Sequence, residues 1–100
     1  MAFHRLAALH ELYDGFRRVV RIGRDELLLL QVEGELYLVD NRCPYQGFPM
    51  DRGSLNGQRL TCPRHGFSFH LRHGDCFQAS SCRLPVFRVA YDGQWVGVEL

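Results

Sequence analysis

Two Cys-Pro pairs, Cys43-Pro44 and Cys62-Pro63, constrain the fold of this chain more than any other feature of the sequence. The proline of each pair has a fixed φ and no N–H, which stiffens the loop around the preceding thiol. Glycines follow both pairs and permit the tight turns that such loops need. The pattern therefore predicts two short, stiff loops, each of which presents a cysteine sulfur.

Length and composition predict one domain over residues 1–100, large enough to bury a core without covalent cross-links. The formal net charge of +1 gives no basic footprint for nucleic acid. No segment has the apolar run of a signal peptide or the length of a membrane span, so we expect a cytoplasmic protein with no membrane partner. In a reducing compartment, cysteines are more often ligands than disulfides. No nucleophile–base pair or carboxylate pair stands at a catalytic spacing, so we expect no enzyme activity.

Short apolar segments separated by turn residues about every 8–12 positions predict an all-β chain. No window has sustained helical periodicity, and only a helical turn is expected between residues 7 and 13. The expected strands lie at residues 3–6, 16–22, 26–32, 35–40, 59–61, 67–71, 86–91 and 94–100. Loops are expected at 53–57 and at 76–82.

The two cysteine loops read Cys43-x-Tyr45, then sixteen residues, then Cys62-x-x-His65. This spacing resembles that of the Rieske [2Fe–2S] domain, in which Cys-x-His is followed by Cys-x-x-His. The segments CP.QG, P.D.G and CP.HG..F are also similar to those of soluble Rieske ferredoxins. The resemblance extends from residue 3 to residue 98. It implies a small antiparallel β-sandwich with two ligand loops at one tip, at 43–48 and 62–67.

The resemblance also implies a [2Fe–2S] cluster, with Cys43 and Cys62 on one iron and His65 on the other. Tyr45 stands where the family has its first histidine, so the chain departs from the family pattern at one ligand. A tyrosine can ligate ferric iron, but it must first lose a proton, whereas a histidine binds in its neutral form. The fourth ligand position could be filled by Tyr45, by solvent or by another side chain.

The function implied by the resemblance is one-electron transfer between a reductase and an oxygenase or similar enzyme, so the expected partners are redox proteins. Phe48 and Arg64 occupy the places where membrane-bound respiratory Rieske proteins carry an extra disulfide, which favours the soluble ferredoxin branch. The alternative is a clusterless Rieske-like structural or interaction subunit, similar to the small subunit of nitrite reductases. In that case Tyr45 would pack into the vacated space.

Two further hypotheses use the remaining cysteines. Cys62-x-x-His65 and His73-x-x-Cys76 have a spacing that could form a four-ligand zinc site. Alternatively, Cys76 and Cys82 could bond to each other, or Cys82 could supply a replacement ligand from a loop beside the cluster. The alternative role for Cys82 is that of a small buried apolar residue.

Overall fold

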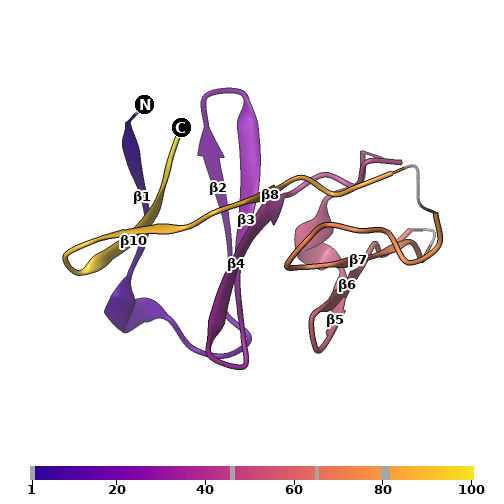
Figure 1. The fold of residues 1–100 in the computed structure, drawn as a ribbon, viewed down its shortest axis with the longest axis horizontal. Coiled ribbons are helices and arrows are strands. Elements are labelled where there is room, and N and C mark those ends of the chain that lie inside the picture. Colours follow the sequence, from indigo (N-terminus) through magenta and orange to yellow (C-terminus); the bar gives the residue numbers. More distant parts are fainter. Residues whose placement is uncertain (1, 46, 65, 80–81) are drawn as a thin grey trace.

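Strands and short 3-10 turns make up all the regular structure in the part of the chain that the computed structural model describes, residues 2–45, 47–64, 66–79 and 82–100 (Figure 1). The predicted all-β fold is confirmed, and the helical turn expected between residues 7 and 13 is the 3-10 helix η1 (Leu9–Glu11). The other 3-10 helix is η2 (Met50–Arg52). The strands are β1 (Phe3–Ala8), β2 (Arg17–Ile22), β3 (Asp25–Val32), β4 (Glu35–Asp40), β5 (Ser54–Asn56), β6 (Arg59–Thr61), β7 (Ser68–His70), β8 (Val86–Phe87), β9 (Ala90–Asp92) and β10 (Trp95–Glu99).

These strands form three antiparallel sheets, with the orders β1-β10-β9, β2-β3-β4-β8 and β5-β6-β7. Figure 1 shows the β1–β10 pair with both termini at one end of the molecule, β2–β4 in the middle, and β5–β7 at the other end. The first cysteine loop leaves β4 of the middle sheet, and the second connects β6 to β7 of the small sheet. Both predicted ligand loops therefore lie at the end of the molecule that is far from the termini.

Strand β3 lies at the centre of the core because both of its faces are covered. Its four consecutive leucines, Leu27 to Leu30, are all fully buried. Side chains alternate between faces along a strand. Leu27 and Leu29 accordingly pack in the cluster formed with β1 and β10, whereas Leu28 and Leu30 pack in the cluster that contains Cys43 and Cys62. The middle sheet is thus the inner layer of a sandwich. The face that carries Leu28 and Leu30 packs against the cysteine loops.

A tight turn at Glu33-Gly34 joins β3 to β4. Val32 pairs with Glu35, so two residues make the connection. Both have positive φ, 51° at Glu33 and 80° at Gly34, as a type I′ hairpin requires. The Asp14 carboxylate accepts a hydrogen bond from the Gly34 N–H at 2.8 Å and fixes this end of the sheet.

Two of the expected elements are wrong. Residues 53–57 were expected to form a loop, but Ser54–Asn56 is a strand that pairs with β6 and buries part of Leu55 against the core. Residues 86–91 were expected to form one strand, but they form β8, which pairs with β4, and β9, which pairs with β10. The chain leaves one sheet for the other between these strands, and an apolar pattern does not reveal such a change of partner.

Candidate metal centre at the two cysteine loops

Loop 1 (residues 43–48) and loop 2 (residues 62–67) have the same sequence pattern, Cys-Pro-x-x-Gly-Phe, and the same closure. In loop 1 the Cys43 N–H donates to the carbonyl oxygen of Phe48 at 2.9 Å. In loop 2 the Cys62 N–H donates to the carbonyl oxygen of Phe67 at 2.7 Å. The fifth residue of each loop is a glycine in the left-handed region, which only glycine adopts without strain. The two loops are therefore structural equivalents of one another.

The two cysteines share one buried environment. Cys43 and Cys62 are each 1% exposed, and both belong to the hydrophobic cluster that also contains Met50, Leu60 and Phe69. The structure therefore places both predicted thiolate ligands in one buried cluster. A buried pair of thiols at equivalent positions fits the half of a Rieske cluster that takes cysteine.

Side chains cross between the loops in a reciprocal arrangement that we call the loop clasp: Tyr45, Phe48, Arg64 and Phe67. The Tyr45 ring is stacked on Phe67, with ring centroids 4.3 Å apart and an interplanar angle of 18°. The Arg64 guanidinium lies over the Phe48 ring, 6.0 Å from its centroid. In both contacts the third residue of one loop meets the sixth residue of the other. The clasp joins the loops at the two positions, 48 and 64, where the resemblance places a disulfide in other members.

The histidine half of the family's ligand set is not complete in this chain, because position 45 is a tyrosine. Tyr45 is 41% exposed and stacked on its neighbour, so at position 45 the chain supplies a phenol ring in place of an imidazole. His65 lies outside the described residues, and its role as a ligand stays a prediction. The donor chemistry of the described residues thus fits the cysteine half of a cluster, and Tyr45 marks the departure in the other half.

Asn41, which was not predicted from the sequence, connects the start of loop 1 to β3 and η2. Its side chain is buried, and its Nδ2 donates to Glu26 Oε2 at 2.8 Å and to Asp51 Oδ1 at 3.0 Å. Its Oδ1 accepts the Asp51 N–H at 2.7 Å. Arg17 also donates to the Asp51 carbonyl oxygen, at 2.8 Å. The hydrogen bond from Asn41 is the main reason that the pKa of Glu26 lies below its usual value. A polar residue between an apolar strand and a cysteine loop is the signal that could have identified Asn41.

Gln78 anchors loop 2 in a similar way. Its Oε1 accepts the backbone N–H of Ser68, a buried residue, at 2.9 Å. Its Nε2 donates to the Gly66 carbonyl oxygen at 3.3 Å and to Ser68 Oγ at 3.1 Å. The Phe77 N–H also donates to the Ser68 carbonyl oxygen, at 2.9 Å. The segment expected to be a loop at 76–82 therefore supports loop 2, and no sequence signal identified Gln78.

The predicted zinc site is not assembled. Cys62 is buried in the core, whereas His73 is exposed and stacks on His70 with ring centroids 5.4 Å apart. Across the described ranges, no group of three or more His, Cys, Asp or Glu side chains is arranged to hold a metal ion. Because Cys62, His73 and Cys76 are all described, the zinc hypothesis is wrong.

Cys76 and Cys82 are both free thiols, so the disulfide considered for them is not formed in this structure. They do lie together, because both line a cavity of about 180 Å³. Cys76 also packs against the cluster that contains Cys43 and Cys62. Whether Cys82 acts as a replacement ligand stays a prediction.

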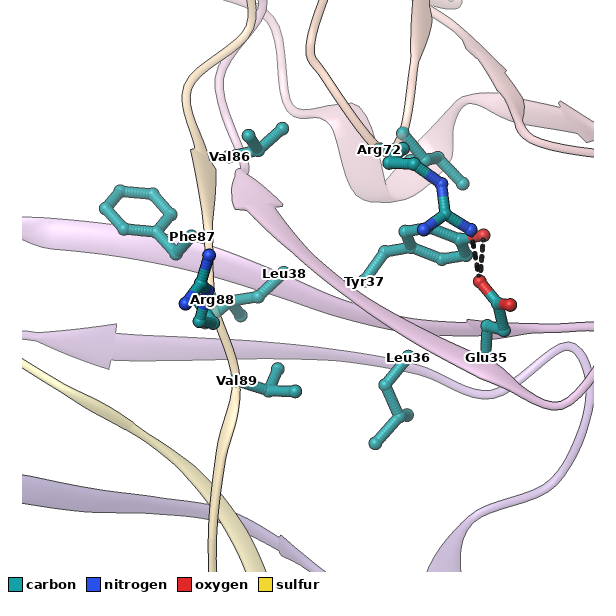
Figure 2. A pocket seen from close by; sticks show the side chains of 10 residues that line it. Glu35, Leu36, Tyr37, Leu38, Arg72, Val86, Phe87, Arg88 and Val89 are labelled. Carbon is teal, nitrogen blue, oxygen red and sulfur yellow. Dashed lines mark hydrogen bonds and ion pairs between the residues drawn. The ribbon is translucent and has the colours of Figure 1, made fainter.

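A pocket of about 480 Å³ lies between β4 and residues 86–89, and Figure 2 shows the side chains around it. The Glu35 carboxylate accepts hydrogen bonds there from Arg72 at 2.6 Å and from the Tyr37 hydroxyl at 3.0 Å. Burial, with a smaller contribution from Glu35, raises the pKa of Tyr37. The residues that line this pocket include no cysteine or histidine, so it is separate from the candidate metal centre.

An all-β sandwich that carries two matching cysteine loops at one end defines a small domain of the iron–sulfur class. The chain belongs to the Rieske [2Fe–2S] domain family, whose model matches residues 2–88. It is 33% identical, over 94 residues, to the ferredoxin component of the naphthalene 1,2-dioxygenase system of Pseudomonas aeruginosa; the match covers 93% of this chain and 90% of that protein. It is also 35% identical to human apoptosis-inducing factor 3 over 65 residues, which are 65% of this chain but only 11% of that protein.

Solved structures agree on the fold. A ferredoxin solved in a complex of reduced oxygenase and oxidised ferredoxin of carbazole 1,9a-dioxygenase superposes with a TM-score of 0.83 at 27% identity, covering 96% of this chain and 100% of that one. A putative NADPH nitrite reductase small subunit superposes with a TM-score of 0.81 at 23% identity over the full length of both chains. No helix in the described part of the chain is long and apolar enough to cross a membrane.

Proposed function

We propose that this chain is a one-electron carrier of the Rieske ferredoxin type, which passes electrons between a reductase and an oxygenase or similar enzyme. The observation that carries this proposal is the burial of Cys43 and Cys62 at equivalent positions of two identically closed loops. One relative that this chain matches over nearly the full length of both proteins is the ferredoxin component of a dioxygenase system. We place the carrier, as one domain, in the cytoplasm, where thiols stay reduced. It has no substrate of its own.

In this proposal Cys43 and Cys62 hold one iron of a [2Fe–2S] cluster and His65 holds the other. When bound, the cluster supplies reversible one-electron exchange. The buried thiol positions keep water away from the cysteine ligands, and the loop clasp joins the two loops. The fourth ligand is either the Tyr45 phenolate or, if the Tyr45 ring remains stacked on Phe67, solvent or another side chain.

Two substitutions at position 45 distinguish these roles. Tyr45→Phe keeps a ring that can stack on Phe67 but removes the phenol oxygen, whereas Tyr45→His supplies the imidazole of the family pattern. After anaerobic reconstitution with iron and sulfide, we expect about two irons and two sulfides per chain in the wild type. If the phenolate is a ligand, Tyr45→Phe changes the visible spectrum and lowers iron content. If Tyr45 only stacks, Tyr45→Phe leaves both unchanged.

The contrary result is a colourless wild-type protein after the same reconstitution, which would refute the carrier proposal whatever the colour of the Tyr45→His variant. A Cys62→Ser variant is the matched negative control, because it removes a ligand that the proposal requires. Far-ultraviolet circular dichroism on every variant separates loss of the cluster from loss of the fold.

The second candidate function is a clusterless structural or interaction subunit. The loop clasp favours it, because Tyr45 on Phe67 and Arg64 over Phe48 join the loops through contacts that need no metal. This candidate predicts a folded, colourless wild-type protein. It also predicts that Tyr45→His alone gains a red-brown chromophore, provided that the other ligands are intact.

A further inference from the structure

Cys76 and Cys82 are placed opposite each other by the register of two neighbouring segments. Asp75 forms an antiparallel bridge with Arg83, and the Leu84 N–H donates to the Gly74 carbonyl oxygen at 2.8 Å. In an antiparallel register the next pair along is Cys76 with Cys82. Directly opposed residues have Cα atoms about 4.5–5.5 Å apart and side chains on the same face. That separation lies within the range of about 4.4–6.8 Å that disulfides span.

The cavity beside these residues supports the same placement independently. Cys76 and Cys82 both line it, together with Asp75, Ala79 and Arg83. Asp75 and Arg83 form an ion pair, with 3.4 Å between Oδ1 and Nε, which fastens the two segments next to the thiols. Neither residue is fully buried, which allows a small reagent to approach the pair.

We propose that Cys76 and Cys82 form a reversible dithiol–disulfide pair, a modification site separate from the metal centre. The oxidant is a low-molecular-weight disulfide such as oxidised glutathione. One cysteine thiolate attacks a glutathione sulfur, which forms a mixed disulfide and releases one reduced glutathione. The other cysteine thiolate then attacks the cysteine sulfur of the mixed disulfide and releases the second glutathione. Two electrons pass from the cysteine pair to the glutathione disulfide, and the two thiol protons pass through water to the departing glutathione thiolates.

The pair is connected to loop 2 through Gln78, which lies between the two cysteines in the sequence. The Cys76 thiol lies 3.6 Å from Gln78 Oε1, and the same amide group binds the Gly66 carbonyl oxygen and the Ser68 N–H. A bond between residues 76 and 82 closes the segment that carries this amide. Oxidation of the pair therefore acts on the support of loop 2 without using either loop cysteine.

Peptide mapping tests the proposal directly, because arginine provides every tryptic cleavage site in this lysine-free sequence. Cleavage after Arg72 and Arg83 releases residues 73–83, which contain both Cys76 and Cys82, whereas Cys43 and Cys62 fall in separate peptides. The protein as purified is equilibrated in glutathione redox buffers, quenched with acid and digested. We expect the 73–83 peptide to lose the mass of two hydrogens and to regain it with dithiothreitol.

Two controls make the result specific. In Cys76→Ser and in Cys82→Ser the remaining cysteine should carry one glutathione, because no second thiol can displace it. The native protein should reach half-oxidation at an oxidised glutathione concentration about tenfold or more below that needed in urea, since the fold holds the thiols close together. Equal concentrations in both conditions would overturn the proposal. Two glutathiones on the 73–83 peptide, or a cross-link to a loop peptide, would overturn it as well.

Discussion

Asn41→Asp is expected to destabilise the protein strongly at neutral pH, although the two side chains have nearly the same shape. Asn41 Nδ2 donates to the carboxylates of Glu26 and Asp51 at 2.8 and 3.0 Å. In the variant an oxygen replaces this donor. The carboxyl group of Asp at position 41 then faces the carboxyl groups of Glu26 and Asp51, with no donor between them. The hydrogen bond from the Asp51 N–H is kept, because an aspartate oxygen can accept it. The perturbation is thus confined to the two bonds that tie loop 1 to β3 and η2.

The size of the effect follows from those two bonds. A hydrogen bond to a charged group contributes about 1.5–3 kcal/mol, so the loss of both would cost about 3–6 kcal/mol. The Glu26 side chain is 31% exposed, and water will replace part of what it loses. We therefore expect the free energy of unfolding to fall by about 2–4 kcal/mol, against the total of about 5–15 kcal/mol that is typical of small domains.

Urea unfolding, followed by the fluorescence of Trp95, measures this loss. The introduced carboxyl group is crowded by two others, so its pKa in the folded state is raised and the variant regains stability as the pH falls. The hydrogen bond from Asn41 lowers the pKa of Glu26, so the wild type keeps this interaction at about pH 5. The deficit, meaning the loss of free energy of unfolding relative to the wild type, should therefore be smaller at about pH 5 than at about pH 7. Asn56→Asp, at an exposed position in β5, is the control. A deficit below about 1 kcal/mol, or one independent of pH, would refute the reasoning.

Two other predictions concern backbone and charge. Gly74→Ala should lower the free energy of unfolding by about 2–5 kcal/mol, because φ is 80° and the new Cβ would overlap the Leu84 carbonyl oxygen. Gly66→Ala, with φ 74° and open space, should cost only about 1–2 kcal/mol, and equal losses in urea unfolding would contradict the clash. The Arg18 guanidinium lowers the pKa of Glu11 to about 2, so the stabilisation by this pair is complete above pH 4.5 and is lost as the pH falls through about 2. Arg18→Gln should raise the Glu11 midpoint in an NMR titration, and an unchanged midpoint would show that the ion pair is not formed in solution.

The sequence was informative wherever local chemistry decides the structure. The hairpin at Glu33-Gly34 follows from a turn that needs two positive φ angles, and the buried β3 strand follows from its run of leucines. Strand β5 was missed because Ser54–Asn56 has little apolar pattern and exists through its pairing with β6. Residues 86–91 look like one strand, but a change of sheet depends on partners that are distant in the sequence.

The same division holds at the candidate site. The placement of Cys43 and Cys62 in two stiff loops could be predicted because proline and glycine mark those loops. Asn41 and Gln78 could not, because each acts through hydrogen bonds to residues that only the tertiary fold brings near. Tyr45 was identified as the departure from the family pattern, but its contact with Phe67 depends on how the loops face each other.

The loop clasp shows that Tyr45 and Phe67 have to be considered together. A stacked aromatic pair contributes about 0.5–1.5 kcal/mol, and an exposed cation–π contact about 0.5–1 kcal/mol. Together the two contacts give about 1–2.5 kcal/mol, which overlaps the lower end of the 2–4 kcal/mol typical of a disulfide. The clasp can open without a chemical reaction, whereas a disulfide at positions 48 and 64 could not. Each loop contributes one side chain to each contact. A change at Tyr45 therefore alters the contact with Phe67 of loop 2 as well as the fourth ligand position. Variants at position 45 therefore have to be compared with Phe67→Leu, which removes the stack and leaves every proposed ligand in place.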